Sequence, residues 1–385
     1  MKTIRVRAEA GNYSVITGRG ALARLGSLIE PMRGKGEVFV LSSPRVWNYW
    51  RNGVKDGLGQ LTSHLRSSLP WERLILFDDS ETAKRLMTVE RICQKLARLG
   101  ADRKALLVAV GGGVVGDVAG YAAASYLRGV KIVHVPTSVV AQMDSAIGGK
   151  TGVDLPEGKN LVGAFHSPQM VISDPDVLET LPAEQYRSGV YEIIKCGVIG
   201  DAELFRFLEQ KIGAVLRMDE RPLDWVMERS ARLKVRVVSR DERENGLRQI
   251  LNFGHTMGHA LEAATGYKRF LHGEAIAWGM LGAALIGVGL GRLGENDAIR
   301  IAVLVARCGS LPKLPEISAA TLLRIVARDK KSRGGRVGWV IPRRIGAAEI
   351  GADVPDWLVA AAWRELPGFF ARAREEVRAS RRRVG

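Results

Sequence analysis

A glycine-rich turn that follows an apolar run constrains the fold of this chain more than any other feature of its sequence. Residues 105–110, ALLVAV, have the length and branched side chains of a buried parallel strand. The next residues are GGGVVG, so that Gly111, Gly113 and Gly116 have the spacing G-x-G-x-x-G. Missing side chains at such positions let backbone N–H groups and a helix N-terminus approach a pyrophosphate. We therefore predict a strand, a turn and a helix here, and favour a nucleotide ligand over a purely structural turn.

One part of the usual dinucleotide pattern is missing downstream of this turn. An acidic residue about twenty positions later normally binds a ribose, and Lys131 stands there instead. The sequence thus disfavours an ordinary Rossmann fingerprint, while the phosphate-binding turn itself is retained.

Short apolar runs alternate with helical patterns through the first half of the chain. The predicted strands are residues 38–41, 73–77, 105–110 and 130–135, and the alternating residues 1–7 predict a further strand at the N-terminus. Strands separated by helices favour a parallel sheet that is covered on both faces. Residues 184–290 instead show long stretches with the 3.6-residue period of helices.

These patterns predict two domains. The first is a Rossmann-like α/β domain with a mostly parallel sheet, residues 1–178, and the second is an all-α domain, residues 179–385. The boundary is placed where Pro175 and Pro182 break local structure. Ligands of open α/β sheets lie beyond the carboxyl ends of the strands, so we expect the active site in the cleft between the two domains.

The composition is that of a soluble globular protein, with 46% hydrophobic and 25% charged residues. The net charge of +16 suggests nucleic acid, but the basic residues cluster densely only at 372–383, where we favour a basic tail or helix without a nucleic-acid partner. Cys93, Cys196 and Cys308 are far apart, which disfavours disulfides and thiolate metal sites. The N-terminus lacks the apolar core of a signal peptide, and residues 275–291 are slightly short for a membrane span, so we expect a cytoplasmic protein without a membrane partner.

A second glycine-rich segment, residues 142–152 with the sequence QMDSAIGGKTG, is followed by Gly158-Lys159-Asn160. Flexible backbone donors beside lysines and an asparagine suit a phosphate or a carboxylate. The segment is not a Walker loop, because Gly149-Lys150-Thr151 would require a glycine five residues before Gly149, where the chain has Asp144. We therefore disfavour a P-loop kinase or ATPase.

A histidine cluster indicates a metal site in the helical half of the chain. His255 and His259 lie one helical turn apart, which lets two imidazoles face one ion, and His272 begins the next apolar helix. Glu192 and Lys195 share one face of a predicted helix, where they could address a common pocket; taken alone, this pair favours a surface ion pair. Three imidazoles and a carboxylate favour a divalent metal, and their spacing leaves open which three of the four bind it. Lys234 and Arg248, with Asn252 beside them, keep this pocket cationic.

Taken in order, these motifs resemble those of the 3-dehydroquinate synthase family of sugar-phosphate cyclases. The likeness extends from about Ser80 to Gly346 and rests on the segments GGGVVGDVAG, YLRG, AQMDSAIGGKTGVDLPEGKNLVGAF, LETLP, YEIIK, GLRQILNFGHTMGHALE, LHGEAIAWGM and DKK. The resemblance implies an N-terminal α/β domain that binds NAD, a helical C-terminal domain, one Zn²⁺ or Co²⁺ ion and a homodimer.

The resemblance also implies roles for individual residues. The implied metal ligands are Glu192, His255 and His272. The positions that match cofactor contacts are Glu81, Lys84, Gly112, Gly113, Asp117, Thr137, Ser138, Lys150, Lys159 and Thr180. The positions that match the surroundings of the substrate are Asp144, Lys150, Asn160, Lys195, Lys234, Arg248, Asn252, His259 and Lys330, with Arg128 reaching the substrate phosphate across a dimer interface.

Two positions depart from the family pattern. Ser43 stands where the family often has an acidic residue after the second strand, which affects a contact to the cofactor ribose. Ser138 replaces the second threonine of the family's Pro-Thr-Thr and keeps its hydroxyl.

The implied reaction is a carbon–oxygen lyase step of the shikimate pathway, which converts 3-deoxy-D-arabino-heptulosonate 7-phosphate to 3-dehydroquinate and phosphate. In it NAD oxidises the C5 hydroxyl with the metal acting as a Lewis acid, phosphate is eliminated, and the hydride is returned. Ring opening and an intramolecular aldol step then close the carbocycle.

Three alternatives remain. A sister cyclase of the valiolone or inosose type is disfavoured because the chain retains a set of residues that suits a substrate carboxylate, namely Lys234, Arg248, Asn252 and His259. A metal-dependent polyol dehydrogenase would share the glycine turn and the histidines, but it would release NADH stoichiometrically. A nucleic-acid-binding protein would explain the net charge and would leave the histidine and glycine clusters without a purpose.

Overall fold

The structure is a computed structural model that describes residues 1–9, 11–59, 61, 70–332 and 338–382. The chain divides into two compact units, Met1–Pro182 with Met227–Arg243, and Ala183–Val226 with Glu244–Gly385. The division falls inside α7 (Glu220–Val238), so that this helix contributes to both units. The domain boundary between residues 178 and 179 stays a prediction. Arg383, at the end of the predicted basic cluster, lies outside the described residues.

A seven-stranded sheet in the order β1-β2-β9-β6-β5-β3-β4 forms the centre of the first unit. All of its neighbouring strands are parallel except β1 and β2, which pair antiparallel. The predicted α/β class and the predicted strands are confirmed. The strands are β1 (Lys2–Val6), β2 (Tyr13–Thr17), β3 (Val38–Ser42), β4 (Leu74–Leu76), β5 (Leu106–Gly111), β6 (Lys131–Pro136) and β9 (Met170–Ser173).

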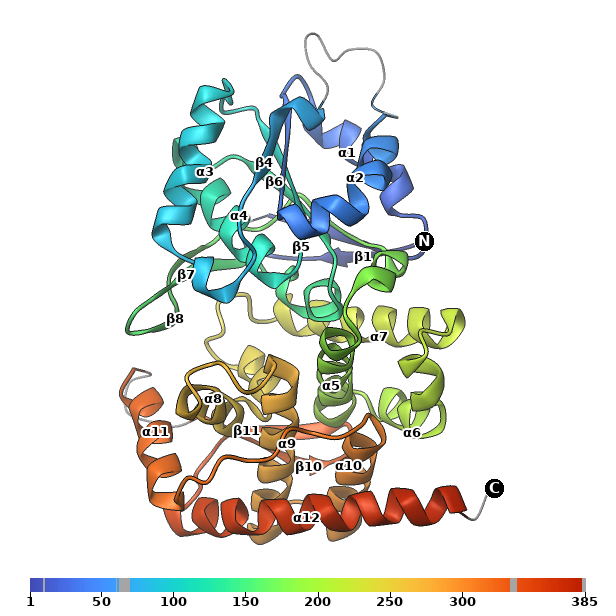
Figure 1. The fold of residues 1–385 in the computed structure, drawn as a ribbon, viewed down its shortest axis with the longest axis vertical. Helices are drawn as coiled ribbons and strands as arrows, with labels where there is room; N and C mark the ends of the chain where they lie inside the picture. The colour runs from blue at the N-terminus through green and yellow to red at the C-terminus, as the bar shows by residue number, and fades with distance from the viewer. Residues whose placement is uncertain (10, 60, 62–69, 333–337, 383–385) are drawn as a thin grey trace. The chain divides into compact units, whose positions relative to one another are not determined.

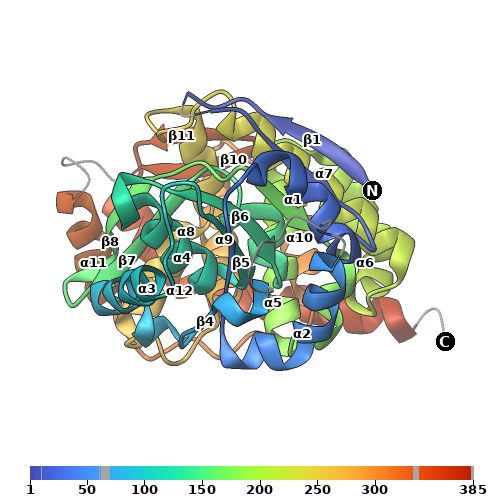
Figure 2. The ribbon, with the colours of Figure 1, turned by 90° about the horizontal axis from the view of Figure 1, so that it is seen from above.

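Helices cover both faces of this sheet, as a parallel sheet requires. Figures 1 and 2 show α1 (Leu25–Arg33) and α2 (Pro44–Leu58) on one side of β5 and β6, and α3 (Leu86–Arg98) and α4 (Gly113–Ser125) on the other. Each face has its own apolar core, with Ile29 and Leu58 in one and Ile92 and Val118 in the other. Every residue of β5 is buried, which explains its unbroken apolar sequence.

A hairpin that the sequence did not predict stands beside α4 in the first unit. Strands β7 (Lys150–Leu155) and β8 (Gly158–Phe165) pair antiparallel, and this pairing begins at Lys150 and Phe165. Thr151 packs against α4 at Gly120, where a Cβ atom would lie 2.4 Å from the threonine methyl. The segment that we interpreted as a binding loop is therefore also a structural hairpin, with Lys150 and Asn160 on its two strands.

The second unit is mostly helical, as predicted, but it is not all-α. Strands β10 (Trp339–Arg344) and β11 (Ala347–Ala352) form a hairpin around a turn in which Gly346 has a φ of 87°. Its first strand buries Val340 and Ile341, so the hairpin is stabilised by apolar contacts within this unit. The helices besides α7 are α5 (Ala183–Gly200), α6 (Ala202–Leu216), α8 (His255–Ala264), α9 (His272–Gly289), α10 (Glu295–Arg307), α11 (Ala319–Ser332) and α12 (Asp356–Arg382).

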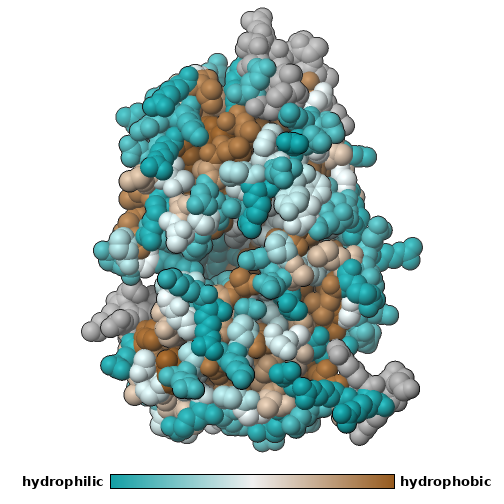
Figure 3. Space-filling view, viewed as in Figure 1, coloured by the Kyte–Doolittle hydropathy of each residue, from teal (hydrophilic) through white to brown (hydrophobic). Residues whose placement is uncertain are grey.

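Two helices of this unit resolve features that were ambiguous in the sequence. The long uncharged run forms α9, which is buried on nearly all sides, and no helix among the described residues has the length and hydrophobicity that crossing a membrane requires. The described basic residues of this cluster, from Arg372 to Arg382, lie on α12, whose Phe369 and Phe370 are buried while Arg372 and Arg378 are exposed. Figure 3 shows hydrophilic side chains over the last turns of α12.

Candidate metal centre and nucleotide-binding residues

The glycine turn joins β5 to α4 in the first unit, as the sequence predicted. Gly112 is the N-cap of α4, so Gly113 begins the helix with its free N–H groups. The backbone N–H of Thr137 donates to the carbonyl of Gly111 at 2.9 Å. Ser138 Oγ lies 3.7 Å from the position that a Cβ on Gly112 would occupy. The predicted cofactor residues 112, 113, 137 and 138 therefore gather at one helix N-terminus, where an anion is stabilised.

A network of charged side chains joins predicted residues that are far apart in the sequence. Lys84 Nζ lies 2.5 Å from Asp117 Oδ2 and also donates to Asn160 Oδ1. Lys159 forms an ion pair with Glu81 at 3.0 Å. Burial raises the pKa of Asp117, and the adjacent Lys84 ammonium opposes this rise. The hairpin and the turn before α3 thus supply a fixed set of opposite charges.

A cavity of about 10 Å³ lies under the glycine turn. It is lined by Gly112 and Gly116, by the carboxylate-bearing Asp117, and by Lys150 and His134. His134 comes from β6, is buried, and has no hydrogen-bond partner for Nδ1 among the described residues. Burial, and to a smaller extent the nearby His166, lowers the pKa of His134 to about 4. This histidine is therefore neutral at physiological pH.

Four other predicted positions lie in the first unit. Lys234 on α7 forms an ion pair with Asp144, and both side chains are largely buried. Thr180 accepts a hydrogen bond from the indole N–H of Trp50 at 2.8 Å. Arg128 has a φ of 68°, and a non-glycine residue in this left-handed region costs on the order of 1 kcal/mol, which often marks a functional position.

Ser43, where the family often has an acidic residue, caps α2 and donates to the carboxylate of Asp79. The Ser43 Oγ to Asp79 Oδ2 distance is 3.0 Å. Asp79 also forms an ion pair with Arg45 at 3.0 Å. A carboxylate is therefore present at this strand end, supplied by the segment after β4.

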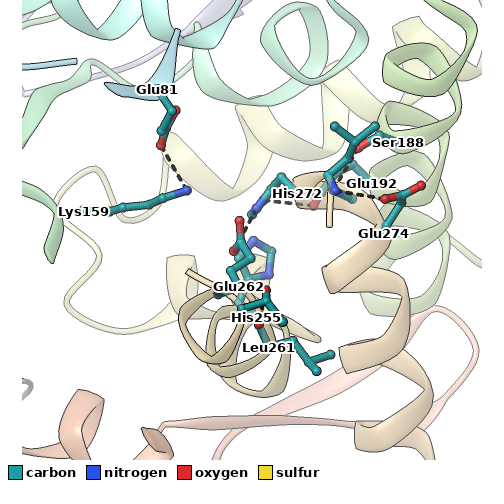
Figure 4. A network of polar contacts seen from close by, with 12 residues as sticks. Glu81, Lys159, Ser188, Glu192, His255, Leu261, Glu262, His272 and Glu274 are labelled. Carbon is teal, nitrogen blue, oxygen red and sulfur yellow. Dashed lines mark hydrogen bonds and ion pairs between the residues drawn. The ribbon is translucent and has the colours of Figure 1, made fainter. Parts of the chain in front are cut away.

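Three helices of the second unit bring together Glu192, His255 and His272. Their ligand atoms all lie within 4.8 Å of one another. Figure 4 shows Glu192 from α5, His255 from α8 and His272 from α9 around one point. The two imidazole centroids are 5.4 Å apart. His255 Nδ1 lies 3.1 Å from the carbonyl oxygen of Phe253, which leaves Nε2 of this ring for a ligand.

The electrostatics of this cluster differ from one side chain to the next. Burial, with Lys195 and the neighbouring histidines, lowers the pKa of His255 well below its usual value. Burial alone would also lower the pKa of His272, but the carboxylates of Glu262 and Glu192 outweigh it and raise the pKa. Lys195 Nζ lies 2.6 Å from Glu192 Oε2, and both side chains are only 1% exposed. The ion pair is therefore buried, and the surface-pair alternative is wrong.

Close backbone contacts explain how the three helices meet. A Cβ atom on Gly273 would lie 1.8 Å from the carbonyl oxygen of Ser188, so α9 begins in direct contact with α5 one turn before Glu192. The N–H of Gly273 also donates to Ser188 Oγ at 2.9 Å. Gly254, with a φ of 80°, starts α8 against the backbone of Ile276 on α9. Larger residues at these two glycines would move the helices that carry His255 and His272.

The remaining predicted residues of this unit lie on the segments around α8. Arg248 is 2% exposed despite its charge. Asn252 donates to Glu244 Oε1 at 2.7 Å. The ring of His259 lies 5.1 Å from that of His255. Lys330 belongs to α11, and its side chain lies outside what the structure describes.

Sequence reasoning missed a carboxylate at the metal cluster. Glu262 is buried, and its Oε2 lies 3.5 Å from His272 Nδ1. Together with His259 and His272 it forms a second group whose ligand atoms lie within 4.8 Å of one another. Its spacing from His259, three residues on the same helix, is a signal that could have revealed it.

The first cluster fits a divalent metal ion. Two imidazoles and one carboxylate are a donor set that zinc and related ions bind, with room for a further ligand. Among the described residues, neither oxygen of the buried Glu192 accepts a hydrogen bond of good geometry, although Lys195 lies close by. A buried carboxylate without such bonds is expected where an ion completes its coordination.

Comparison with known proteins identifies the family. The family model described as 3-dehydroquinate synthase N-terminal matches residues 74–188, and the C-terminal model of the same family matches residues 189–332. A 3-dehydroquinate synthase of Solibacter usitatus is 42% identical over 352 residues, covering 91% of this chain and 96% of that protein.

Two similar solved structures are sister cyclases. The 2-epi-5-epi-valiolone synthase of Streptomyces hygroscopicus with NAD⁺ and Zn²⁺ bound is 28% identical, has a TM-score of 0.82, and is matched over 92% of this chain and 97% of its own. A 2-deoxy-scyllo-inosose synthase complexed with carbaglucose-6-phosphate, NAD⁺ and Co²⁺ is 27% identical, with a TM-score of 0.82 and coverage of 94% and 99%. The family models account for most of the chain and the first relative for nearly its full length. The chain therefore belongs to the 3-dehydroquinate synthase family.

Proposed function

We propose that this chain converts 3-deoxy-D-arabino-heptulosonate 7-phosphate to 3-dehydroquinate and phosphate, with NAD and one divalent ion bound. The observation that carries the proposal is the convergence of Glu192, His255 and His272 in a protein of this family. The substrate is favoured over those of the sister cyclases because the chain is 42% identical to a 3-dehydroquinate synthase but only 28% and 27% identical to the two solved sister enzymes.

The ion held by Glu192, His255 and His272 would supply Lewis acidity to the C5 hydroxyl, and NAD would accept and return its hydride. Zn²⁺ is the ion we propose, with Co²⁺ as a substitute, because relatives of this chain bind both. Lys195 keeps a positive charge beside Glu192, so that the buried carboxylate is compensated whether or not an ion is present.

The cofactor residues would bind NAD through a helix end and fixed charges. The N–H groups at Gly112 and Gly113 suit the pyrophosphate. Lys84, Asp117 and the Lys159–Glu81 pair are held by one another and so need little reordering on binding. Thr137, Ser138 and Thr180 add hydroxyls, and Asp79 offers a carboxylate beside Ser43 for a ribose.

The substrate residues would act mainly by position and charge. The ends of the substrate are anionic, and the lysines and arginine proposed to bind them include Lys150, Lys195, Lys234, Arg248 and Lys330, with Asp144, Asn160, Asn252 and His259 as hydrogen-bonding partners. Lys234 is held by Asp144 before any substrate arrives. Such preorganised charge lowers the barrier without reorganisation during the reaction.

The assay that tests this function supplies the heptulosonate phosphate with a substoichiometric amount of NAD and follows both phosphate and the dehydroquinate product. We expect many turnovers per NAD and no net NADH. Net NADH in proportion to substrate consumed would instead support a polyol dehydrogenase. Turnover only with heptose or hexose phosphates that lack a carboxylate would support a sister cyclase.

We also propose that the active protein is a homodimer in which Arg128 reaches the phosphate bound by the partner. The first unit exposes apolar side chains here: Leu127, next to Arg128, is 40% exposed, and Leu161 and Phe165 on β8 are 54% and 43% exposed. His166, next to Phe165, lies 2.9 Å from the carbonyl of Val130, which places the end of β8 beside the segment that carries Arg128. Light scattering should show a dimer that Leu161→Asp weakens, and a fully active monomer would contradict the proposal.

A further inference from the structure

A second carboxylate faces the metal cluster from the side opposite to Glu192. His272 Nε2 lies 3.6 Å from Glu192 Oε1, and the other nitrogen of the same ring, Nδ1, lies 3.5 Å from Glu262 Oε2. Figure 4 shows His272 between the two glutamates. The ring of His272 thus spans two acidic groups with its two nitrogens.

The chemistry of imidazole assigns a different task to each nitrogen. A neutral histidine binds a metal through one nitrogen and carries a proton on the other. If Nε2 faces the ion together with Glu192 and His255, the proton is on Nδ1 and needs an acceptor. Nδ1 faces Glu262, whose side chain is only 5% exposed, so water competes little for its carboxylate oxygens.

The other histidine ligand has the same arrangement with a different acceptor. His255 Nδ1 lies 3.1 Å from the carbonyl oxygen of Phe253, which fixes that ring from the backbone. His272 is the first residue of α9 and is partly exposed, with 39% of its side chain accessible. It is therefore the ligand whose orientation depends most on a side-chain partner.

We propose that Glu262 is a positioning residue of the metal site, which accepts a hydrogen bond from the Nδ1–H of His272 and directs its Nε2 toward the ion held with Glu192 and His255. The inference rests on the proposed metal site. Glu262 is well suited to this task because it is on α8, the helix that also carries His255. One rigid helix thus supplies a ligand and the group that orients the second ligand. A carboxylate acceptor also makes the imidazole a stronger donor to the ion.

The test measures Co²⁺ binding by metal-free protein, through the visible absorption of the bound ion and without substrate or NAD. Glu262→Ala should weaken Co²⁺ binding by about 10–100-fold, the usual effect of losing such a partner. Glu262→Gln should lose less affinity, because its amide oxygen still accepts a hydrogen bond from Nδ1–H. At saturating Co²⁺ both variants should bind one ion with the wild-type spectrum, because the atoms that contact the ion are unchanged.

The matched control is Glu274→Gln. Glu274 lies two residues after His272 on α9 and accepts a hydrogen bond from the backbone N–H of Leu271 at 2.9 Å, so the variant loses a nearby negative charge without touching the imidazole. It should bind Co²⁺ like the wild type. Circular dichroism and Tm show whether each variant is folded. If the alanine variant is not folded, the glutamine variant, which preserves the side-chain volume, provides the test.

Three results would overturn the inference, and they differ from one another. Unchanged Co²⁺ affinity in both Glu262 variants would mean that His272 needs no such partner. An altered spectrum, or a loss as complete as in His272→Ala, would make Glu262 a direct ligand, in the alternative group with His259 and His272. Absence of Co²⁺ binding by the wild type would reject the metal site and the proposed function together.

Discussion

His134 should make the first unit lose stability in mild acid, because its imidazole is buried as the neutral base. Its pKa is lowered to about 4, first by burial and then by His166. In the unfolded chain the usual value applies, about 6.5. Between these two values the unfolded state binds a proton that the folded state does not. Stability from this residue is therefore complete above about pH 6.5 and is lost as the pH falls toward 4.

The magnitude follows from the two pKa values. A pH of 5 is about 1.5 units below the pKa of the imidazole in the unfolded chain, and each unit corresponds to about 1.36 kcal/mol. The free energy of unfolding should therefore fall by about 2 kcal/mol between pH 7.5 and pH 5. The variant His134→Gln has no group that titrates here. Other titrating groups, including Asp117, are common to both proteins and cancel in the difference.

Hydrogen–deuterium exchange of the β5 and β6 amides measures the effect within the first unit. After correction for intrinsic exchange rates, the wild type should lose about 30-fold more protection between pH 7.5 and pH 5 than His134→Gln does, which corresponds to about 2 kcal/mol. The comparison uses the pH dependence, so a constant cost of the substitution does not affect it. Equal losses of protection in the two proteins would refute a buried neutral imidazole at this position.

Two further predictions concern the site itself. Gly273→Ala should lower Tm and weaken metal binding, because the new Cβ would lie 1.8 Å from the Ser188 carbonyl oxygen and push α9 away from α5. The control is Gly294→Ala in the same unit, where φ is −70° and a Cβ would meet no atom within 4 Å. A wild-type Tm and metal affinity in Gly273→Ala would reject the packing argument. Lys150→Ala should lower kcat/KM by roughly two orders of magnitude or more, as expected for a lost charged contact in the transition state, and near-normal kinetics would remove Lys150 from the site.

Local patterns predicted most of the first unit. Residues 105–110 are apolar without alternation because β5 is buried on both faces, and the glycines after it form the turn into α4. The β7–β8 hairpin was missed because the lysines and glycines that suit an anion also hide the period of a strand. The strand pair after Gly338 was missed because two short strands in a helical region give little signal.

The candidate site shows the same limit. The spacing of His255 and His259 predicted a metal cluster, because both residues are on one helix. Spacing could not choose among the four ligands, since the choice depends on the contact of Gly273 with Ser188, which are far apart in the sequence. The resemblance to the family supplied the assignment of Glu192, and the structure places that side chain with His255 and His272. The Lys84–Asp117 pair likewise depends on tertiary packing.

The most direct test of the account is a metal titration of the metal-free protein in the phosphate-release assay. With the heptulosonate phosphate and catalytic NAD present, the rate of phosphate release should rise linearly with added Zn²⁺ and reach a plateau at one equivalent per chain. Glu192→Gln should bind no ion under the same conditions and form no dehydroquinate. Full activity of the wild type with undetectable bound metal would contradict the account.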